Sequence, residues 1–256
     1  MALTLGLFAT GPVGREIARF VREQGAKVGC LVLDSGEEAA SREAIRAEAA
    51  IDPTRVFYSD DLYQPGTLDR LRSLRLDLIV LAWWPYILKS PLVEMPSAGC
   101  LNFHPSLLPH NRGKHYNFWA LVEEAPFGVT LQLIDAGVDT GDVVFQAPIE
   151  TTWEDTGETL YRKAQAEIVR LFKEKFPDIR EGRLPRKPQD LSRGSFHKAH
   201  EIDQASKLEL GRSYTARQLL NVLRARTFPP HPAAWFEDQG KQYEVRVTIT
   251  PKIKRD

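Results

Sequence analysis

Short apolar runs alternate with amphipathic segments along the first hundred residues of the chain. The apolar runs are rich in β-branched and aromatic residues and occupy 3–9, 27–34, 55–59, 76–84 and 98–104. Helical patterns separate most of these runs, and the first helical pattern begins at Pro12 and ends near Gly25. Strands that alternate with helices predict an α/β fold in which a mostly parallel, twisted sheet has helices on both faces.

This regular alternation does not continue to the C-terminus. We therefore expect a large N-terminal domain, residues 1–184, and a small C-terminal subdomain that contains β structure, residues 185–256. Within the subdomain, the stretch 243–249 is a candidate edge strand, and an edge strand exposes backbone groups that can pair with a second chain.

The turn after the first strand resembles a dinucleotide-binding loop only in part. Gly11 and Gly14 lie in this turn, and Asp34 closes the second strand about 20 residues later, as a ribose-binding acid would. However, Ala9 stands where the first glycine of G-x-G-x-x-G is required. The fold is Rossmann-like, but the turn is better explained as a tight connection with Pro12 at the first helical position.

Charge and cysteine usage narrow the class of protein. The 256 residues include 34 Lys and Arg and 34 Asp and Glu, so no net charge directs the chain to nucleic acid or to a membrane. A mild basic surplus after residue 180 is a weak indication of an anionic ligand. Cys30 and Cys100 lie in apolar runs, and neither a signal peptide nor a membrane-spanning run is recognisable. We expect a cytoplasmic protein.

The stretch CLNFHPSLLPHNRG, residues 100–113, carries the most specific chemistry. Side chains alternate along a strand, so Cys100, Asn102 and His104 share one face of the strand that Pro105 ends. In an α/β fold, ligands bind outside the carboxyl ends of the strands. Asn102 and His104 are therefore candidates for a catalytic pair held on rigid backbone.

Two motifs resemble the folate-dependent formyltransferase family, whose members transfer a formyl group from 10-formyltetrahydrofolate to an amine. They are NFHPSLLPHNRG, residues 102–113, and GVTLQLIDAGVDTGDVVFQ, residues 128–146. The resemblance covers roughly residues 1–175 and implies that Asn102, His104 and Asp139 are the catalytic residues. Because the spacing from His104 to Asp139 is about one residue shorter than in many relatives, Asp135 and Asp142 remain alternative acids.

Two further stretches resemble the sugar N-formyltransferases within this family. They are GKHYNFWALVEEAPFGV, residues 113–129, and LNVLRARTFPPHPAAWFEDQGKQYEVRV, residues 220–247. The resemblance implies an amino sugar substrate carried on a nucleotide, 10-formyltetrahydrofolate as co-substrate, a homodimer, and no nucleic-acid or membrane partner. It also implies a pterin site at Trp84, Pro85, Tyr86, Ile87, Asp135 and Val138. A polar, cationic and aromatic cluster close behind the strand that carries Asn102 and His104 suits a phosphate and a sugar, and its members are Arg112, Lys114, His115, Tyr116 and Asn117.

The chemistry of formyl transfer requires these residue types. A neutral amine attacks the formyl carbon, and the carbonyl oxygen then becomes negative. The Asn102 amide and the His104 imidazolium can donate hydrogen bonds to that oxyanion, and Asp139 would orient His104. Cys100 shares the catalytic face, but a buried strand cysteine is better explained as core.

The other histidines predict neither a metal site nor a second catalytic group. The spacings of His104, His110 and His115 suit no zinc motif. His197 and His200 fall in a polar segment that we expect at the surface.

Several functions remain as alternatives to sugar formylation. Transfer to initiator methionyl-tRNA predicts a larger basic surface and salt-dependent binding. Hydrolysis of 10-formyltetrahydrofolate predicts formate release without an amine. A sensing module that keeps the fold without turnover and a dehydrogenase are the remaining alternatives.

Overall fold

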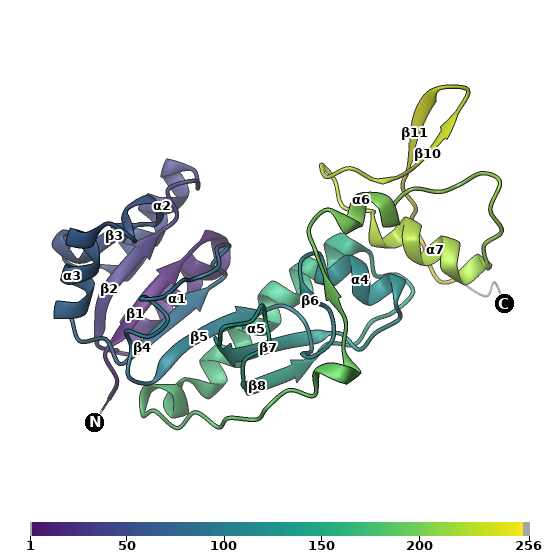
Figure 1. Cartoon of the computed structure of the whole chain (residues 1–256). Helices are drawn as coiled ribbons and strands as arrows, with labels where there is room; N and C mark the ends of the chain where they lie inside the picture. Colours follow the sequence, from purple (N-terminus) through teal and green to yellow (C-terminus); the bar gives the residue numbers. More distant parts are fainter. Residues whose placement is uncertain (1, 253–256) are drawn as a thin grey trace. The chain divides into compact units, whose positions relative to one another are not determined.

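The computed structural model describes residues 2–252, and its central element is a seven-stranded sheet (Figure 1). The strand order is β3-β2-β1-β4-β5-β7-β8. The five strands β1 to β5 pair in parallel, and β7 pairs with β5 in the antiparallel sense. The bounds are β1 (Leu5–Ala9), β2 (Val28–Leu33), β3 (Val56–Tyr58), β4 (Leu78–Ala82), β5 (Gly99–His104), β7 (Gly128–Leu133) and β8 (Val143–Pro148). The predicted mostly parallel sheet is confirmed.

Helices cover both faces of this sheet, as the alternation predicted. Their bounds are α1 (Gly11–Glu23), α2 (Ala39–Ala49), α3 (Pro65–Ser73) and α5 (Gly157–Arg180). On one face, Phe20 of α1 packs against Phe176 of α5 with ring centroids 5.2 Å apart. On the other face, Leu71 of α3 belongs to a buried apolar cluster that includes Cys30 and Cys100.

The central strands β1 and β4 are buried on both faces, which explains why their sequences are continuous apolar runs rather than alternating ones. All five residues of β1 and all five of β4 are buried. Helix α1 begins directly after β1 because Gly11 adopts a positive φ and Pro12 has the backbone angle of a first helical turn. The core therefore follows the apolar runs in the sequence.

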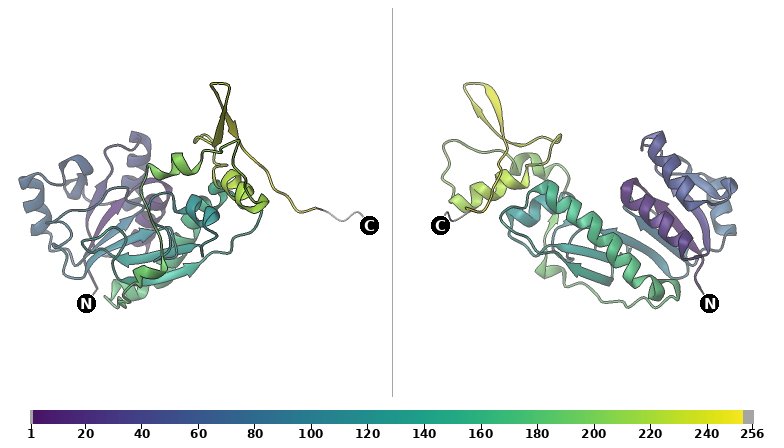
Figure 2. Two further views of the ribbon diagram at one scale, coloured as in Figure 1. Left: turned by 45° about the vertical axis from the view of Figure 1, so that its right-hand side comes forward. Right: turned by 180° about the vertical axis from the view of Figure 1, so that it is seen from behind.

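The remaining elements are short. They are β6 (Arg112–Gly113), α4 (Tyr116–Val122), β9 (Phe196–His197), α6 (Glu201–Ala205), α7 (Ala216–Ala225), β10 (Ala234–Asp238) and β11 (Lys241–Val245), with single 3-10 turns at Pro53–Arg55, Ser59–Asp61 and Leu191–Arg193. Strands β10 and β11 form an antiparallel hairpin that stands away from α7 in each view (Figure 2). The candidate edge strand at 243–249 is thus β structure only as far as Val245.

The chain forms two compact units. The first contains the chain up to His104, together with Thr130–Gln146 and Ile168–Gln189. The second contains Pro105–Val129, Ala147–Glu167 and the described residues from Asp190 onward. The division into domains 1–184 and 185–256 stays a prediction. Between residues 2 and 252, no helix has the length and apolar character needed to cross a membrane.

We expect Gly14 to be required where α1 packs on β1. A Cβ atom at Gly14 would lie 2.8 Å from the backbone carbonyl carbon of Ala9, so backbone would have to move. Gly14→Ala should therefore lower the free energy of unfolding by about 1–3 kcal/mol, although alanine favours helix. Gly66 in α3 is the matched control, because a Cβ there meets nothing within 4 Å. Urea unfolding should show Gly66→Ala unchanged or stabilised; equal effects at both positions would contradict the packing argument.

Candidate functional site

The carboxyl end of β5 presents Asn102 and His104 on one face, as the alternation predicted. The strand ends at His104, where Pro105 follows without an N–H group. Phe103 faces the opposite way and packs on Phe172, with ring centroids 5.2 Å apart. His104 is only 4% exposed, and Asn102 is half-buried. The backbone therefore fixes the positions of both polar side chains.

Strand β7 brings two more polar residues to the same face. In the antiparallel register Gln132 lies opposite Asn102, and Thr130 lies opposite His104. Gln132 is 1% exposed and Thr130 is fully buried. Thr130 accepts a hydrogen bond of 3.0 Å from Nε2 of Gln146 in β8. Four polar residues thus lie on one buried surface of the sheet.

The loop after β7 turns back along that strand. The N–H of Leu133 donates to the carbonyl oxygen of Asp142 at 2.9 Å. Gly141 is required here, because a Cβ would lie only 1.7 Å from the Leu133 carbonyl oxygen. Asp135 closes the loop by accepting hydrogen bonds from the N–H of Gly137 and the hydroxyl of Thr140. This tight loop therefore brings the second motif, residues 128–146, close to the first motif, residues 102–113.

Asp139 is the acid that contacts His104. Its Oδ1 lies 3.3 Å from Nδ1 of His104 and also accepts a hydrogen bond of 2.9 Å from Nε2 of Gln132. The backbone of Asp139 has a φ of +53°, a conformation that non-glycine residues seldom adopt. Gln189 stabilises this turn by donating from Nε2 to the carbonyl oxygens of Asp139 and Gly141, at 3.0 and 2.7 Å.

Cys100, which lies on the same face of β5 as Asn102 and His104, is part of the core. It is 1% exposed, and burial raises the pKa of its thiol to about 12. A thiol with so high a pKa is a poor nucleophile at neutral pH because almost none of it is thiolate. This agrees with the expectation that Cys100 is structural.

The segment predicted to hold the pterin follows β4, beside the point where the strand order reverses. Trp84 is 8% exposed and contacts Phe8 edge-on, with centroids 5.3 Å apart. Tyr86 is 49% exposed and Ile87 is 71% exposed. The Tyr86 hydroxyl donates to Oδ1 of Asp34 at 2.8 Å, and this hydrogen bond raises the pKa of the phenol. Trp84 is thus core, whereas Pro85, Tyr86 and Ile87 are exposed.

The first turn is occupied by the chain's own side chains. The N–H of Gly11 donates to Oε1 of Glu37 at 2.8 Å, and Ser41 donates to the same oxygen at 2.5 Å. A carboxylate therefore lies at the amino end of α1, where a dinucleotide would place its pyrophosphate. Asp34 is held by Tyr86 and by the N–H of Gly36. Both observations argue against dinucleotide binding.

The predicted substrate residues lie in the second unit. Arg112 is the first residue of β6 and pairs with Phe196 of β9, and the N–H of Lys114, directly after β6, donates to the His197 carbonyl oxygen at 3.0 Å. His115 has a φ of +60°, and its Nε2 lies 3.2 Å from the Ala199 carbonyl oxygen. Burial lowers the pKa of the His115 imidazole, and the charges of Arg226 and Lys114 lower it further.

Two members of that predicted set are engaged in packing. Tyr116 lies between Phe127 and Tyr161, each with its ring centroid 6.5 Å away, and burial raises the pKa of its phenol well above the usual value. Nδ2 of Asn117 donates to the Gly157 carbonyl oxygen at 2.8 Å. Both side chains therefore position the start of α4.

His197 does not lie at the surface, so that prediction was wrong. Its ring stacks on Trp119 at 3.8 Å, and Nε2 lies 2.8 Å from Oε1 of Glu123. Nδ1 lies 3.3 Å from Oε2 of Glu201. These partners bury a side chain that the polar sequence around it placed in solvent; His200 is exposed, as expected. The cluster fixes β9 beside Arg112–Gly113.

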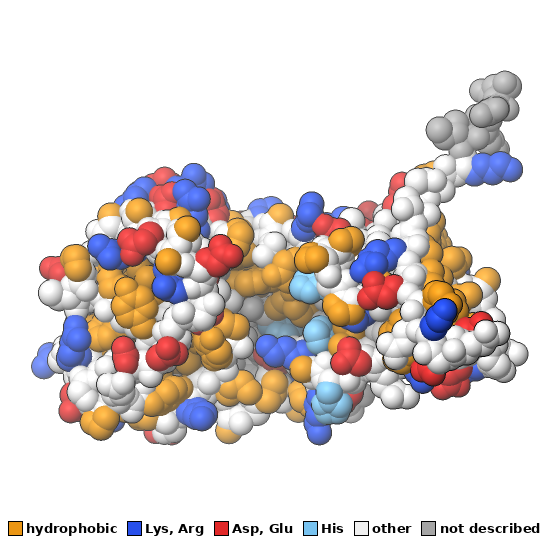
Figure 3. Space-filling model, turned by 90° about the horizontal axis from the view of Figure 1, so that it is seen from above, with side chains coloured by type: hydrophobic (Ala, Val, Ile, Leu, Met, Phe, Trp, Pro, Cys, Tyr) orange, Lys and Arg blue, Asp and Glu red, His pale blue; other side chains and the backbone are white. Residues whose placement is uncertain are grey.

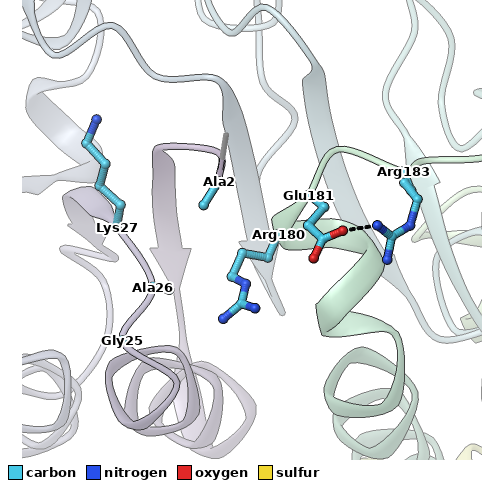
Figure 4. A pocket seen from close by; sticks show the side chains of 7 residues that line it. All are labelled: Ala2, Gly25, Ala26, Lys27, Arg180, Glu181 and Arg183. Atoms are coloured by element: carbon cyan, nitrogen blue, oxygen red, sulfur yellow. Dashed lines mark hydrogen bonds and ion pairs between the residues drawn. The ribbon is translucent and has the colours of Figure 1, made fainter.

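A separate hollow of about 510 Å³ lies at the amino ends of the parallel strands (Figure 4). None of the predicted site residues lines it. Its lining residues are Ala2, Gly25, Ala26, Lys27, Arg180, Glu181 and Arg183, and Glu181 pairs with Arg183. Within residues 2–252, no group of three or more His, Cys, Asp or Glu side chains could hold a metal ion.

Solved structures of sugar N-formyltransferases have the same fold. A sugar N-formyltransferase from a Shewanella species matches with a TM-score of 0.78, covering 98% of each chain at 19% identity. The N-formyltransferase of Helicobacter canadensis, in complex with folinic acid and dTDP-3-aminofucose, matches with a TM-score of 0.72. That match covers 93% of this chain and 85% of the other at 18% identity. At such identities the likeness concerns the fold.

Sequence similarity extends to curated proteins and to family models. The methionyl-tRNA formyltransferase of Agathobacter rectalis is 31% identical over 192 residues, which are 74% of this chain and 60% of that protein. The chain thus spans about 60% of that relative's length. Residues 201–251 match the N-formyltransferase dimerization C-terminal domain. Residues 7–174, more than half of the chain, match the formyl transferase model, and the chain therefore belongs to the formyl transferase family.

Proposed function

We propose that the chain transfers a formyl group from 10-formyltetrahydrofolate to the amine of a nucleotide-linked amino sugar. The observation that carries the proposal is the arrangement of Asn102, His104 and Asp139 at the carboxyl end of β5, with Nδ1 of the buried His104 3.3 Å from the Asp139 carboxylate. Membership of the formyl transferase family supports the reaction class. The likeness to a sugar N-formyltransferase over 98% of both chains supports the branch.

In the proposed mechanism Asn102 and His104 stabilise negative charge. When the amine attacks, the formyl oxygen becomes an oxyanion, and the Asn102 amide and the His104 ring donate hydrogen bonds to it. The oxyanion then collapses as the bond between the formyl carbon and the folate nitrogen breaks, and that nitrogen takes up the proton that the amine loses, so tetrahydrofolate leaves. One such preorganised donor contributes on the order of 3 kcal/mol to barrier lowering. Asp139 directs Nδ1 of His104 toward itself, so Nε2 is the nitrogen that acts on the reacting groups. The strand and the loop hold these groups before the substrate arrives.

We propose that the folate lies beside the segment Pro85–Ile87 and the loop that carries Asp135 and Val138. The side chains of Tyr86, Ile87 and Val138 are between 40% and 71% exposed, which is unusual for apolar groups and suits a flat heterocycle. The indole Nε1 of Trp84 is buried without a hydrogen-bond partner among residues 2–252. The proposed folate fits this combination because it offers both an apolar ring face and hydrogen-bond acceptors.

Transfer to initiator methionyl-tRNA is the second candidate, and the sequence similarity to methionyl-tRNA formyltransferases favours it. One observation weighs against it. On the face that Figure 3 presents, Lys and Arg side chains are interspersed with Asp and Glu side chains rather than gathered into one basic patch. A tRNA platform would need such a patch to neutralise phosphates.

We also propose a homodimer formed through the C-terminal region, whose residues match a dimerization domain. The hairpin of β10 and β11 is a two-stranded sheet; Trp235 of β10 also bridges to Lys207 on its outer side, whereas no strand of the described part of the chain pairs with the outer edge of β11. Phe236 and Tyr243 stack on one of its faces with centroids 5.3 Å apart, and Tyr243 is 45% exposed. Such an edge with aromatic residues suits pairing with a second copy.

Release of tetrahydrofolate from 10-formyltetrahydrofolate tests the reaction and its acceptor. We expect release only when an amino sugar from a panel of nucleotide-linked sugars is present, with formation of the formamide detected by mass spectrometry. Release without an amine would identify a hydrolase. Turnover with initiator methionyl-tRNA, together with binding that weakens steeply with salt, would identify the tRNA branch instead.

Replacing either oxyanion donor should lower turnover and leave binding nearly intact. We expect Asn102→Ala or His104→Ala to lower kcat by roughly 100-fold or more, because each donor acts mainly in the transition state. Cys100→Ala is the matched control on the same face of the same strand, and its kcat should be unchanged. Steady-state kinetics and folate-binding measurements on each variant test this prediction. Near-normal turnover of either variant would show that the replaced residue is not an oxyanion donor.

Substitutions of Asp139 and Gln132 should lower kcat by different amounts, with the larger loss at Asp139. Asp139→Asn keeps the shape of the side chain but removes its charge, and we expect kcat to fall by about 100-fold. Gln132→Met keeps the volume but removes the donor that holds Asp139, so we expect a smaller loss of about 10-fold. A double variant no worse than Asp139→Asn alone would confirm that Gln132 acts through Asp139. Independent, additive losses would contradict this.

A further inference from the structure

Arg226, directly after α7, is a buried cation without an adequate counter-ion in the described part of the chain. It is 8% exposed, and its Nε atom is buried without a hydrogen-bond partner there. The carboxylate that comes nearest to a pairing distance is that of Asp203, 4.0 Å from Nη2, and the Asp203 side chain is 79% exposed. A buried guanidinium normally has close, hydrogen-bonded partners, because desolvation of an ion costs several kcal/mol.

Arg224, two residues earlier, is an equally buried arginine whose guanidinium has hydrogen-bond partners. It is 7% exposed, and its Nε donates to Oδ1 of Asn221 at 3.0 Å. Its Nη1 donates to the Thr152 carbonyl oxygen at 2.6 Å, and its guanidinium lies 4.7 Å from the centre of the Trp153 ring. Arg224 therefore serves the packing of the second unit, whereas the packing around Arg226 leaves its Nε donor without a partner in the described part of the chain.

The groups around Arg226 favour an anion. His115 and Lys114, both in the predicted substrate segment, are close enough that the charges of Arg226 and Lys114 lower the pKa of His115. Glu244 and Asp203 both bring negative charge to Arg226, but the hydrogen bonds that Glu244 accepts come from Arg246 and from the N–H of Ala233. Burial lowers the pKa of Arg226 itself, which reflects the cost of its position.

We propose that Arg226 binds a phosphate of the nucleotide that carries the amino sugar. The inference rests on the proposed function and adds a residue outside the predicted substrate set. A guanidinium offers two parallel N–H donors that match two oxygens of one phosphate, and Arg is preferred over Lys for this geometry. Lys114, which is exposed, would supply a second charge to the same diphosphate. These contacts to the diphosphate would contribute to substrate affinity whichever sugar the nucleotide carries.

Binding of nucleoside diphosphates to the whole chain, without folate, tests this assignment. Calorimetry would compare UDP, dTDP, GDP and CDP with their nucleosides, and we expect at least one diphosphate to bind more tightly than its nucleoside. Arg226→Gln should weaken diphosphate binding by about 10- to 100-fold, as loss of a charged hydrogen-bond pair does, and leave nucleoside binding unchanged. Arg226→Lys, which keeps the charge but not the fork, should give an intermediate loss.

Arg217→Gln is the matched control, because it makes the same change of charge on α7 at an exposed, paired side chain. It should bind diphosphates as the wild type does. Asp203→Asn should bind them equally or more tightly, since it removes a competing carboxylate. Equal diphosphate affinities for Arg226→Gln and wild type, or equal losses for Arg226→Gln and Arg217→Gln, would overturn the proposal. Failure of formyl transfer with Arg226-dependent diphosphate binding intact would instead refute only the reaction.

Discussion

The reversal of strand direction between β5 and β7 is the constraint on which the candidate site depends. A parallel neighbour would begin at the far end of β5, but the antiparallel β7 begins beside His104 and runs back toward Leu101. Its polar residues then lie directly opposite the catalytic candidates. Because the following loop must also return over β7, Asp139 reaches His104 although 35 residues separate them in the sequence. The site thus follows from sheet topology.

The same reversal of strand direction also makes the site costly in folding free energy. Bringing a carboxylate against a buried imidazole removes both from water, and a buried charge is tolerated only when it is paired and hydrogen-bonded. Gln132 donates a hydrogen bond from Nε2 to Oδ1 of Asp139, and Gln189 donates one to the backbone carbonyl oxygen of the same residue. The positive φ at Asp139 adds strain that these contacts must offset. Two neutral amides therefore hold the Asp139 carboxylate and its turn against the His104 ring without adding charge.

The sequence predicted the sheet well because the physical cause of each strand is local. Runs buried on both faces are apolar throughout, and turn residues bound them, so β1, β2, β4 and β5 lie where the pattern put them. The shared face of Asn102 and His104 followed from the two-residue period of a strand. Asp139 came from a resemblance, because no local rule links it to His104.

Residues that act through distant contacts escaped prediction. Gln189 lies 50 residues beyond Asp139, in a segment with no periodicity, and nothing in its neighbourhood marks it. His197 lies in a polar stretch and is buried by Trp119 and Glu123, more than 70 residues earlier. Arg224 and Arg226 differ by two positions, yet one is satisfied and the other is not. Such differences depend on tertiary packing, which a pattern of single residues does not encode.

The two compact units carry different parts of the proposed function. The first unit carries the catalytic candidates and the folate segment on a regular sheet, where a small shift of one strand would misplace every group on its face. The second carries the substrate segment and Arg226 on short helices and loops, joined by contacts such as the stack of His197 on Trp119. Under the proposed function, substitutions there change which nucleotide sugar binds without disturbing the sheet. Specificity is therefore free to vary while the reacting geometry is kept.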